Sequence, residues 1–309
     1  MTSGPPFDHP TTPESRTPPP DRSRREFVLA GAAVLLAGVS GRAQRPAVTA
    51  QQVVDRIRSS VGVPWRDTTV DTFKAGDPNV VVTGIATTVM ATMPVLRQAA
   101  AAGRNLIITY EPVFYAGNDA PGPRATDPVY LAKQAFIDEH HLVVWRFSDH
   151  WQARKPNELT SALAETLGWS AGRTAGNDSL FAVPPTTLGA VANHVRTRLG
   201  IRGGMRTVGQ AGYRITRIAL SPGTSDLLSS VQMLQQADLI VSGEPREWEA
   251  VEYVFDTASA GQPKSMIAVG RLVSEEPGMR ACAAWLGKLV PEVPVENIAI
   301  GDPYWRPSL

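Results

Sequence analysis

The hydrophobic positions of this chain fall into short unbroken runs that are separated by longer segments of mixed character. Four runs have the length and aliphatic composition of buried strands, and they lie at 105–109, 142–147, 237–241 and 265–269. N-cap residues, early prolines and terminal glycines between them predict helices over 93–102, 128–140, 157–168, 186–200, 224–236, 245–258 and 276–290. Because strands alternate with helices, we expect an α/β protein whose strands pair mostly in parallel.

Each of these apolar runs leads into an acidic residue. Glu111 and Asp149 follow the first two runs, Glu244 follows the third, and Glu275 comes shortly after the fourth. The carboxyl ends of parallel strands meet along one edge of a sheet, where ligand sites gather. We therefore expect these carboxylates to lie close together, with His150 as the candidate histidine because it directly follows Asp149.

The first 43 residues have the features of an export address. Residues 1–22 are rich in proline and polar residues and lack apolar periodicity, which predicts a disordered n-region. Arg24 and Arg25 then precede an uncharged apolar stretch that ends at Gly41-Arg42-Ala43. This arrangement resembles a twin-arginine export signal and predicts a periplasmic or other extracytoplasmic location. The apolar stretch is shorter than the ~20 residues that span a bilayer, so we expect no stable membrane insertion after processing.

Charge and composition narrow the classes of partner. The chain has 30 basic and 29 acidic residues, of which five and four lie in the first 43, leaving 25 of each in the remainder. Because the chain after residue 43 has no net charge, nucleic acid is not an expected partner. The single cysteine, Cys282, excludes an internal disulfide and a cysteine-rich metal site. The chain also lacks the G-x-G-x-x-G, Walker A, G-x-S-x-G and H-E-x-x-H patterns.

Several segments in order resemble the Nif-three-like dinuclear metal-centre hexameric family. They are Asn105–Pro112, Trp145–His150, Ile218–Ser225, Ala237–Glu244 and Gly270–Met279. The resemblance implies a two-lobed Nif-three-like α/β fold with mostly parallel strands and flanking helices. It places a first lobe at 44–168, a middle lobe at 169–262 and a return to the first lobe at 263–309. It further implies assembly into a homohexameric ring.

The metal site of that family is only partly represented here. The family holds two metals with two adjacent histidines, an aspartate and a His-x-x-x-Glu pair, and the resemblance aligns these with Tyr110, Glu111, Asp149, Arg271 and Glu275. The three carboxylates suit a hard or mixed-ligand cation, whereas arginine stays protonated and cannot ligate a metal. The sequence leaves three alternatives open: no tightly bound metal, one divalent ion such as Mg, Mn or Zn, or two metals.

Under the first hypothesis for function, the protein is an exported metal-assisted hydrolase of unknown substrate. Glu111, Asp149 and Glu275 would bind a cation that activates water. His150 or Glu244 would then transfer the proton.

In the same hypothesis, Tyr110 and Arg271 bind an anionic group of the substrate or transition state, which makes a small anion the expected ligand. The alternative hypothesis is a non-catalytic, ring-forming binding or scaffold protein. In that case the metal site has decayed, and Arg271 holds the acidic residues in an ion-pair network.

Overall fold

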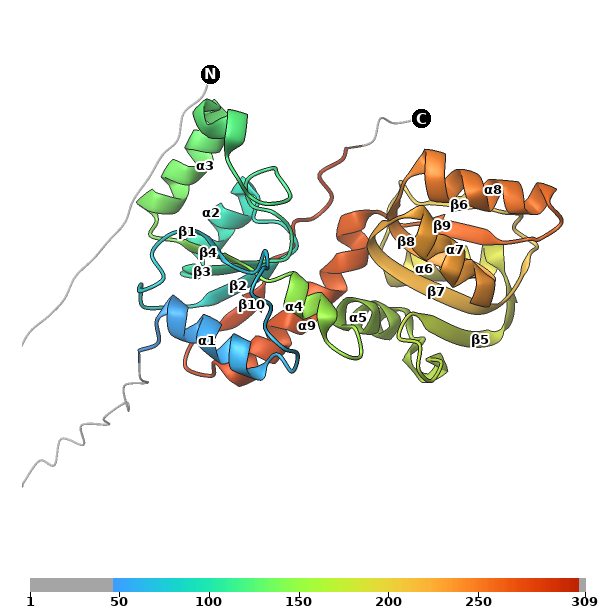
Figure 1. Cartoon of the computed structure of the whole chain (residues 1–309), viewed down its shortest axis with the longest axis horizontal. Helices are drawn as coiled ribbons and strands as arrows, with labels where there is room; N and C mark the ends of the chain where they lie inside the picture. The colour runs from blue at the N-terminus through green and yellow to red at the C-terminus, as the bar shows by residue number, and fades with distance from the viewer. Residues whose placement is uncertain (1–46, 306–309) are drawn as a thin grey trace, which may run out of the picture. The chain divides into compact units, whose positions relative to one another are not determined.

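The computed structural model describes residues 47–305, and Figure 1 shows the arrangement of their helices and strands. The expectations for the disordered n-region and the export signal at 1–43 fall outside these residues. Two five-stranded sheets organise the described chain, one formed mainly by its first third and the other by residues from 180 onward. No helix in 47–305 combines the length and the apolar character needed to cross a bilayer.

The first sheet has the strand order β1-β4-β3-β2-β10. Its strands are β1 (Phe73–Ala75), β2 (Ile85–Thr88), β3 (Leu106–Thr109), β4 (Val143–Arg146) and β10 (Val295–Asn297). β10, β2, β3 and β4 pair in parallel, whereas β1 joins the edge of β4 antiparallel. Every residue of β2, β3 and β4 is buried, as expected for parallel strands covered by helices on both faces. The covering and connecting helices of this half are α1 (Ala50–Ser60), α2 (Met93–Ala101), η1 (Gly122–Thr126), α3 (Pro128–Glu139) and α4 (Asp149–Ala153).

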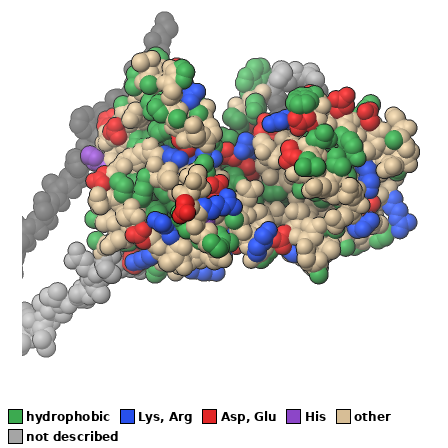
Figure 2. Space-filling model, viewed as in Figure 1, with side chains coloured by type: hydrophobic (Ala, Val, Ile, Leu, Met, Phe, Trp, Pro, Cys, Tyr) green, Lys and Arg blue, Asp and Glu red, His purple; other side chains and the backbone are tan. Residues whose placement is uncertain are grey.

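The second sheet has the strand order β5-β7-β8-β9-β6. Its strands are β5 (Leu180–Thr187), β6 (Arg206–Val208), β7 (Arg214–Ser225), β8 (Leu239–Pro245) and β9 (Ser265–Ala268). β7, β8 and β9 pair in parallel, and the edge strands β5 and β6 are antiparallel. The helices of this half are α5 (Glu158–Leu167), η2 (Ser170–Gly172), α6 (Leu188–Arg198), α7 (Leu227–Gln236), the π-helical turn η3 (Glu247–Val251) and α8 (Glu252–Ser259). Large apolar side chains are exposed on α7, η3 and α8, and Figure 2 shows green side chains over this part of the molecule.

The expected α/β fold with mostly parallel strands is confirmed, and the four apolar runs form β3, β4, β8 and β9. The boundary at residue 263 is wrong. β9 hydrogen bonds in parallel to β8, so it completes the second sheet rather than returning to the first. The chain returns along α9 (Arg271–Leu289), which contacts strands of both sheets.

The start predicted for this last helix is also wrong. α9 begins at Arg271, five residues before Glu276, and Pro277 lies inside it. Pro277 is the seventh residue of α9, so its missing N–H leaves the Val273 carbonyl without its usual intrahelical donor, and the proline does not mark the helix start. The earlier start places Arg271 and Glu275 one helical turn apart on the same face.

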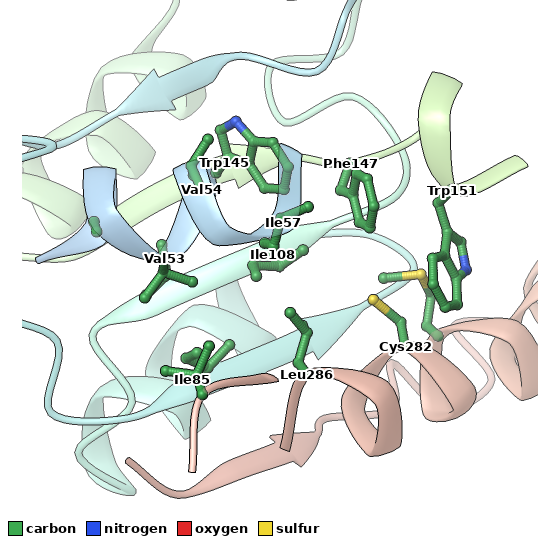
Figure 3. Packing of buried hydrophobic residues seen from close by; sticks show 14 of the residues in the cluster. Val53, Val54, Ile57, Ile85, Ile108, Trp145, Phe147, Trp151, Cys282 and Leu286 are labelled. Carbon is green, nitrogen blue, oxygen red and sulfur yellow. The ribbon is translucent and has the colours of Figure 1, made fainter. Parts of the chain in front are cut away.

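Helix α9 also closes the main hydrophobic core. Ile57 of α1, Ile108 of β3 and Trp151 of α4 pack with Cys282 and Leu286 of α9, and each is fully buried (Figure 3). α9 packs in this core and also contacts β7 and β8 of the second sheet. Its first turn therefore lies near the carboxyl ends of strands from both sheets.

Candidate functional site: an arginine among carboxylates

The guanidinium of Arg271 lies among three of the carboxylates expected from the sequence. Its Nη2 donates a hydrogen bond to Oε1 of Glu111, its Nε is 3.4 Å from Oε1 of Glu275, and its Nη1 is 4.0 Å from Oε2 of Glu244. Glu111 and Glu275 are buried, whereas the Glu244 side chain is exposed. The four side chains, which we call the Arg271 cluster, join residues separated by up to 164 positions.

Three different elements position the Arg271 cluster. Glu111 comes two residues after β3 in the first sheet, and Glu244 lies near the end of β8 in the second sheet. Arg271 and Glu275 occupy the first turns of α9, directly after β9. The cluster therefore forms where strands of both sheets reach their carboxyl ends, which is where ligand sites of open α/β sheets are found.

Glu275 is the most deeply buried member of the Arg271 cluster. Its side chain is 1% exposed, and its Oε2 has no hydrogen-bond partner. Burial, followed by repulsion from Glu111, raises the pKa of Glu275 to about 8 even though Arg271 acts in the opposite direction. At neutral pH this group is a neutral carboxylic acid, and it can donate a proton or a hydrogen bond.

Tyr110 lies beside the cluster and is almost fully buried. The side chain of Ser148, the residue before α4, lies near the Tyr110 hydroxyl. Burial, with the nearby charges of Glu275 and Glu111, raises the pKa of Tyr110 above its usual value. Tyr110 is therefore a neutral hydroxyl at the site and not a phenolate.

Two glycines allow the second sheet to approach the cluster. Gly223 has φ +79°, and a Cβ added there would lie 2.5 Å from Oε1 of Glu275. A Cβ at Gly243 would lie 2.4 Å from both the Gly223 carbonyl oxygen and Oγ of Ser274. Ser274 fixes this approach, because its hydroxyl accepts a hydrogen bond from the Gly223 amide at 2.9 Å and donates one to the Arg271 carbonyl at 2.7 Å. Any larger residue at either position would displace the cluster.

A chain of buried serine hydroxyls lies in the adjoining strands. Ser221 and Ser225 of β7 are 2.8 Å apart at their hydroxyl oxygens, and Ser225 is 2.6 Å from Ser242 of β8. The sequence analysis did not single out these serines or Ser274. The pattern that could have identified three of them is local, because Ser225, Ser242 and Ser274 each directly precede a glycine or an acidic residue in the strand-end motifs.

Asp149 turns away from this arrangement. Its Oδ2 accepts hydrogen bonds from the Thr69 hydroxyl at 2.8 Å and from the Val70 amide at 3.1 Å. Partial burial alone would raise the pKa of Asp149, but these hydrogen bonds and the nearby Arg66 outweigh it and hold the pKa below its usual value. The carboxylate is therefore held by the segment between α1 and β1.

His150 is fully buried and has a structural environment. Its Nδ1 is 2.6 Å from Oδ2 of Asp71, its Nε2 accepts a hydrogen bond from the Arg66 amide at 3.0 Å, and its ring stacks on Trp65. The accepting Nε2 indicates a neutral ring with its proton on Nδ1. Both ring nitrogens are thus occupied. Asp71 also accepts hydrogen bonds from the backbone amides of Ser148, Asp149 and His150. The sequence did not reveal this role of Asp71, because nothing in its local sequence marks it as buried.

The residues present do not fit the metal centre that the fold family implies. Arg271 lies between Glu111 and Glu275, where its charge opposes a cation, and the carboxylate of Asp149 is hydrogen bonded elsewhere. Within residues 47–305, no group of three or more His, Cys, Asp or Glu side chains is placed to hold a metal ion.

Two sheets of mostly parallel strands, a shared helix α9 and a polar cluster at the strand ends define an α/β protein with one site between its two sheets. The sequence profile of Duf34/NIF3 (NGG1p interacting factor 3) matches residues 72–303. The chain belongs to this family.

Solved structures agree with this assignment at the level of the fold. The Staphylococcus aureus hypothetical protein SA1388 is 17% identical with a TM-score of 0.68, and the alignment covers 84% of this chain and 100% of that one. A Bacillus cereus protein related to NIF3 is 14% identical, with a TM-score of 0.67 and coverages of 84% and 100%. Reduced HcgD from Methanocaldococcus jannaschii is 14% identical, with a TM-score of 0.60 and coverages of 83% and 99%. No curated protein matches the chain.

Proposed function

We propose that this chain is a non-catalytic, self-assembling binding protein in which an arginine replaces the metal centre of its family. The observation that carries the proposal is the position of Arg271, which pairs with Glu111 and lies 3.4 Å from Glu275 and 4.0 Å from Glu244. Three carboxyl groups face one guanidinium, so the cluster has no spare positive charge for an anionic substrate. Its role is to connect the first sheet, α9 and the second sheet.

Electrostatic repulsion from Arg271 opposes the binding of a metal ion at this place. A unit charge ~4 Å from a cation costs about 4 kcal/mol per unit of cation charge at an effective dielectric of ~20, so a dication would lose at most about 8 kcal/mol. The partly exposed Arg271 side chain lowers this cost through solvent screening. Even half of it weakens metal binding by about a thousandfold.

An exposed apolar surface supports self-association. Leu228 of α7, Trp248 of η3 and Phe255 of α8 are 68%, 72% and 68% exposed, and Leu227 and Tyr253 of the same elements are also exposed. These elements contact one another, and large apolar side chains exposed on neighbouring elements are a feature of interaction surfaces. A neutral chain after residue 43 does not oppose association of copies. A ring of copies, six in the family resemblance, is the proposed assembly.

The first prediction tests both parts of this proposal on the protein purified without a His-tag. Elemental analysis is expected to find far less than one divalent metal ion per chain, and light scattering is expected to give several times the monomer mass. Addition of a chelator should leave the thermal midpoint unchanged, because no metal contributes to folding.

The opposite results would support the metal-assisted hydrolase. One such result is near-stoichiometric metal in the purified protein. The other is hydrolysis of an ester, amide or phosphoester substrate from a panel, provided that the Glu111→Ala variant lacks this activity. A monomer at micromolar concentration would remove the ring from the proposal.

We also propose that the chain is exported by the twin-arginine route, on the basis of Arg24, Arg25 and the apolar stretch that follows. The second prediction is that replacing both residues, as Arg24→Lys with Arg25→Lys, retains the precursor in the cytoplasm. Cell fractionation with immunoblotting measures this, and Arg22→Lys is the matched control because it lies outside the pair. Equal amounts of the double variant and the parent outside the inner membrane would show that another route is used.

A further inference from the structure

A separate pocket lies in the first half of the chain. Its volume is ≈ 390 Å³, which is within the usual range for small-molecule sites. Helix α1, the segment that leads into β1 and strand β4 line it, with Val54, Trp65, Phe73 and Trp145 as the apolar wall and Arg58 and Arg66 as the cationic groups. The carboxylates of the Arg271 cluster do not line this pocket.

The aromatic wall of the pocket is fixed from behind. Trp65 stacks on His150 with ring centroids 3.7 Å apart and planes 3° apart, and Trp145 stacks on Trp65 at 6.4 Å. His150 is in turn held by Asp71 and by the Arg66 amide. A wall whose rings are already held in place lowers the entropy lost when a flat ligand binds against it.

Neither guanidinium group at the pocket forms a close ion pair among the described residues, although Arg66 lies near enough to Asp149 to lower the pKa of that carboxyl. Arg58 lies over the Trp65 ring at 5.1 Å, and the hydrogen bond of Arg66 to His150 comes from its backbone amide, not from its guanidinium. Asp67 also lines the pocket, whereas the oxygens of Asp71 are used by the amides at the start of α4 and by His150. Two arginines and two aspartates thus line the pocket, and because the Asp71 oxygens are already hydrogen bonded, the two guanidinium groups and Asp67 are the charged groups left for a ligand.

We propose that this pocket binds a small organic anion with a flat aromatic body and a carboxylate group. The aromatic body packs against the partly exposed rings of Trp65 and Phe73, and the carboxylate receives hydrogen bonds from Arg58 and Arg66. Guanidinium groups match a carboxylate in geometry as well as in charge. The proposal goes beyond the function given above and does not depend on the state of the Arg271 cluster.

A pair of probes of equal shape tests the charge requirement. Titration calorimetry on the full chain is expected to show that 2-naphthoate binds with a dissociation constant below about 1 mM. 2-Naphthamide, which has the same aromatic body and no charge, is expected to bind at least about tenfold more weakly because it cannot form a charge-assisted hydrogen bond. Quenching of tryptophan fluorescence by 2-naphthoate should follow the same curve, since two tryptophans line the pocket.

Arginine variants connect this binding to the pocket. Arg58→Gln and Arg66→Gln keep long polar side chains at exposed positions, and each is expected to weaken 2-naphthoate binding about tenfold while 2-naphthamide binding stays unchanged. Arg97→Gln on α2 is the matched control, because Arg97 is exposed and does not line the pocket. Circular dichroism checks that each variant folds.

Three results would overturn the proposal. They are absence of 2-naphthoate binding at 5 mM, equal binding of the acid and the amide, and undiminished binding by the variant that carries both arginine substitutions. Failure of the proposed non-catalytic function would appear instead as bound metal in the parent protein, so the two outcomes are distinguishable.

Discussion

The variant with Tyr110→His and Arg271→His is expected to bind Zn²⁺ near stoichiometrically, whereas the parent binds it weakly or not at all. The two substitutions remove the guanidinium that lies between Glu111 and Glu275, and they supply two imidazoles beside these carboxylates. Two imidazoles and two carboxylates are a suitable donor set for zinc. Removal of the arginine charge alone relieves a repulsion of up to about 8 kcal/mol for a dication.

Titration calorimetry with Zn²⁺ measures this result on both proteins. Arg271→Gln is the matched control, since it removes the charge without adding a ligand and should raise the Zn²⁺ affinity by up to about a thousandfold, yet less than the double variant. Equal Zn²⁺ affinity in the parent and the double variant would show that Arg271 does not exclude a metal. The assigned role of the Arg271 cluster would then be wrong.

Glu275→Gln is expected to remove much of the pH dependence of stability between pH 5 and pH 8. The pKa of Glu275 is about 8 in the folded protein, against an ordinary value near 4.5 in the unfolded chain. Between these values the folded state holds a proton that the unfolded state lacks, so this group's contribution to stability is full below about pH 4.5 and is lost as the pH rises through 8. The parent should therefore lose roughly 3 kcal/mol of unfolding free energy over this interval that the variant does not lose.

Urea unfolding at pH 5, 7 and 9 measures the effect as a difference between the parent and the variant. Other titrating groups cancel in this difference if the substitution leaves the structure unchanged. Glu165→Gln on α5 is the control, because Glu165 is exposed and should give the same pH profile as the parent. Identical profiles for Glu275→Gln and the parent would show that Glu275 is ionised in the folded protein at neutral pH.

The strand ends could be predicted from the sequence, because the same local pattern, an apolar run followed by a polar residue, occurs at each of them. Parallel strands buried on both faces require apolar runs, and the polar residue that ends each run marks the carboxyl edge. This reasoning brought Glu111, Glu244 and Glu275 into one neighbourhood, and the structure places all three around Arg271. The same reasoning also grouped Asp149 with them, but the direction of a side chain at a strand end depends on the segment that packs above it. Here that segment supplies Thr69 and Val70 as hydrogen-bond donors.

The sequence by itself determined the alternation of strands and helices, the mostly parallel pairing and the segments that contribute acidic residues to the site. These properties follow from hydrophobic periodicity and helix capping, which act over a few residues. Only the tertiary structure decided that β9 belongs to the second sheet, that His150 is held by Asp71 and that Arg271 reaches Glu111 across 160 positions of the chain. Each of these depends on contacts between distant segments, and the free energy of such contacts comes from burial and charge pairing that no local pattern encodes.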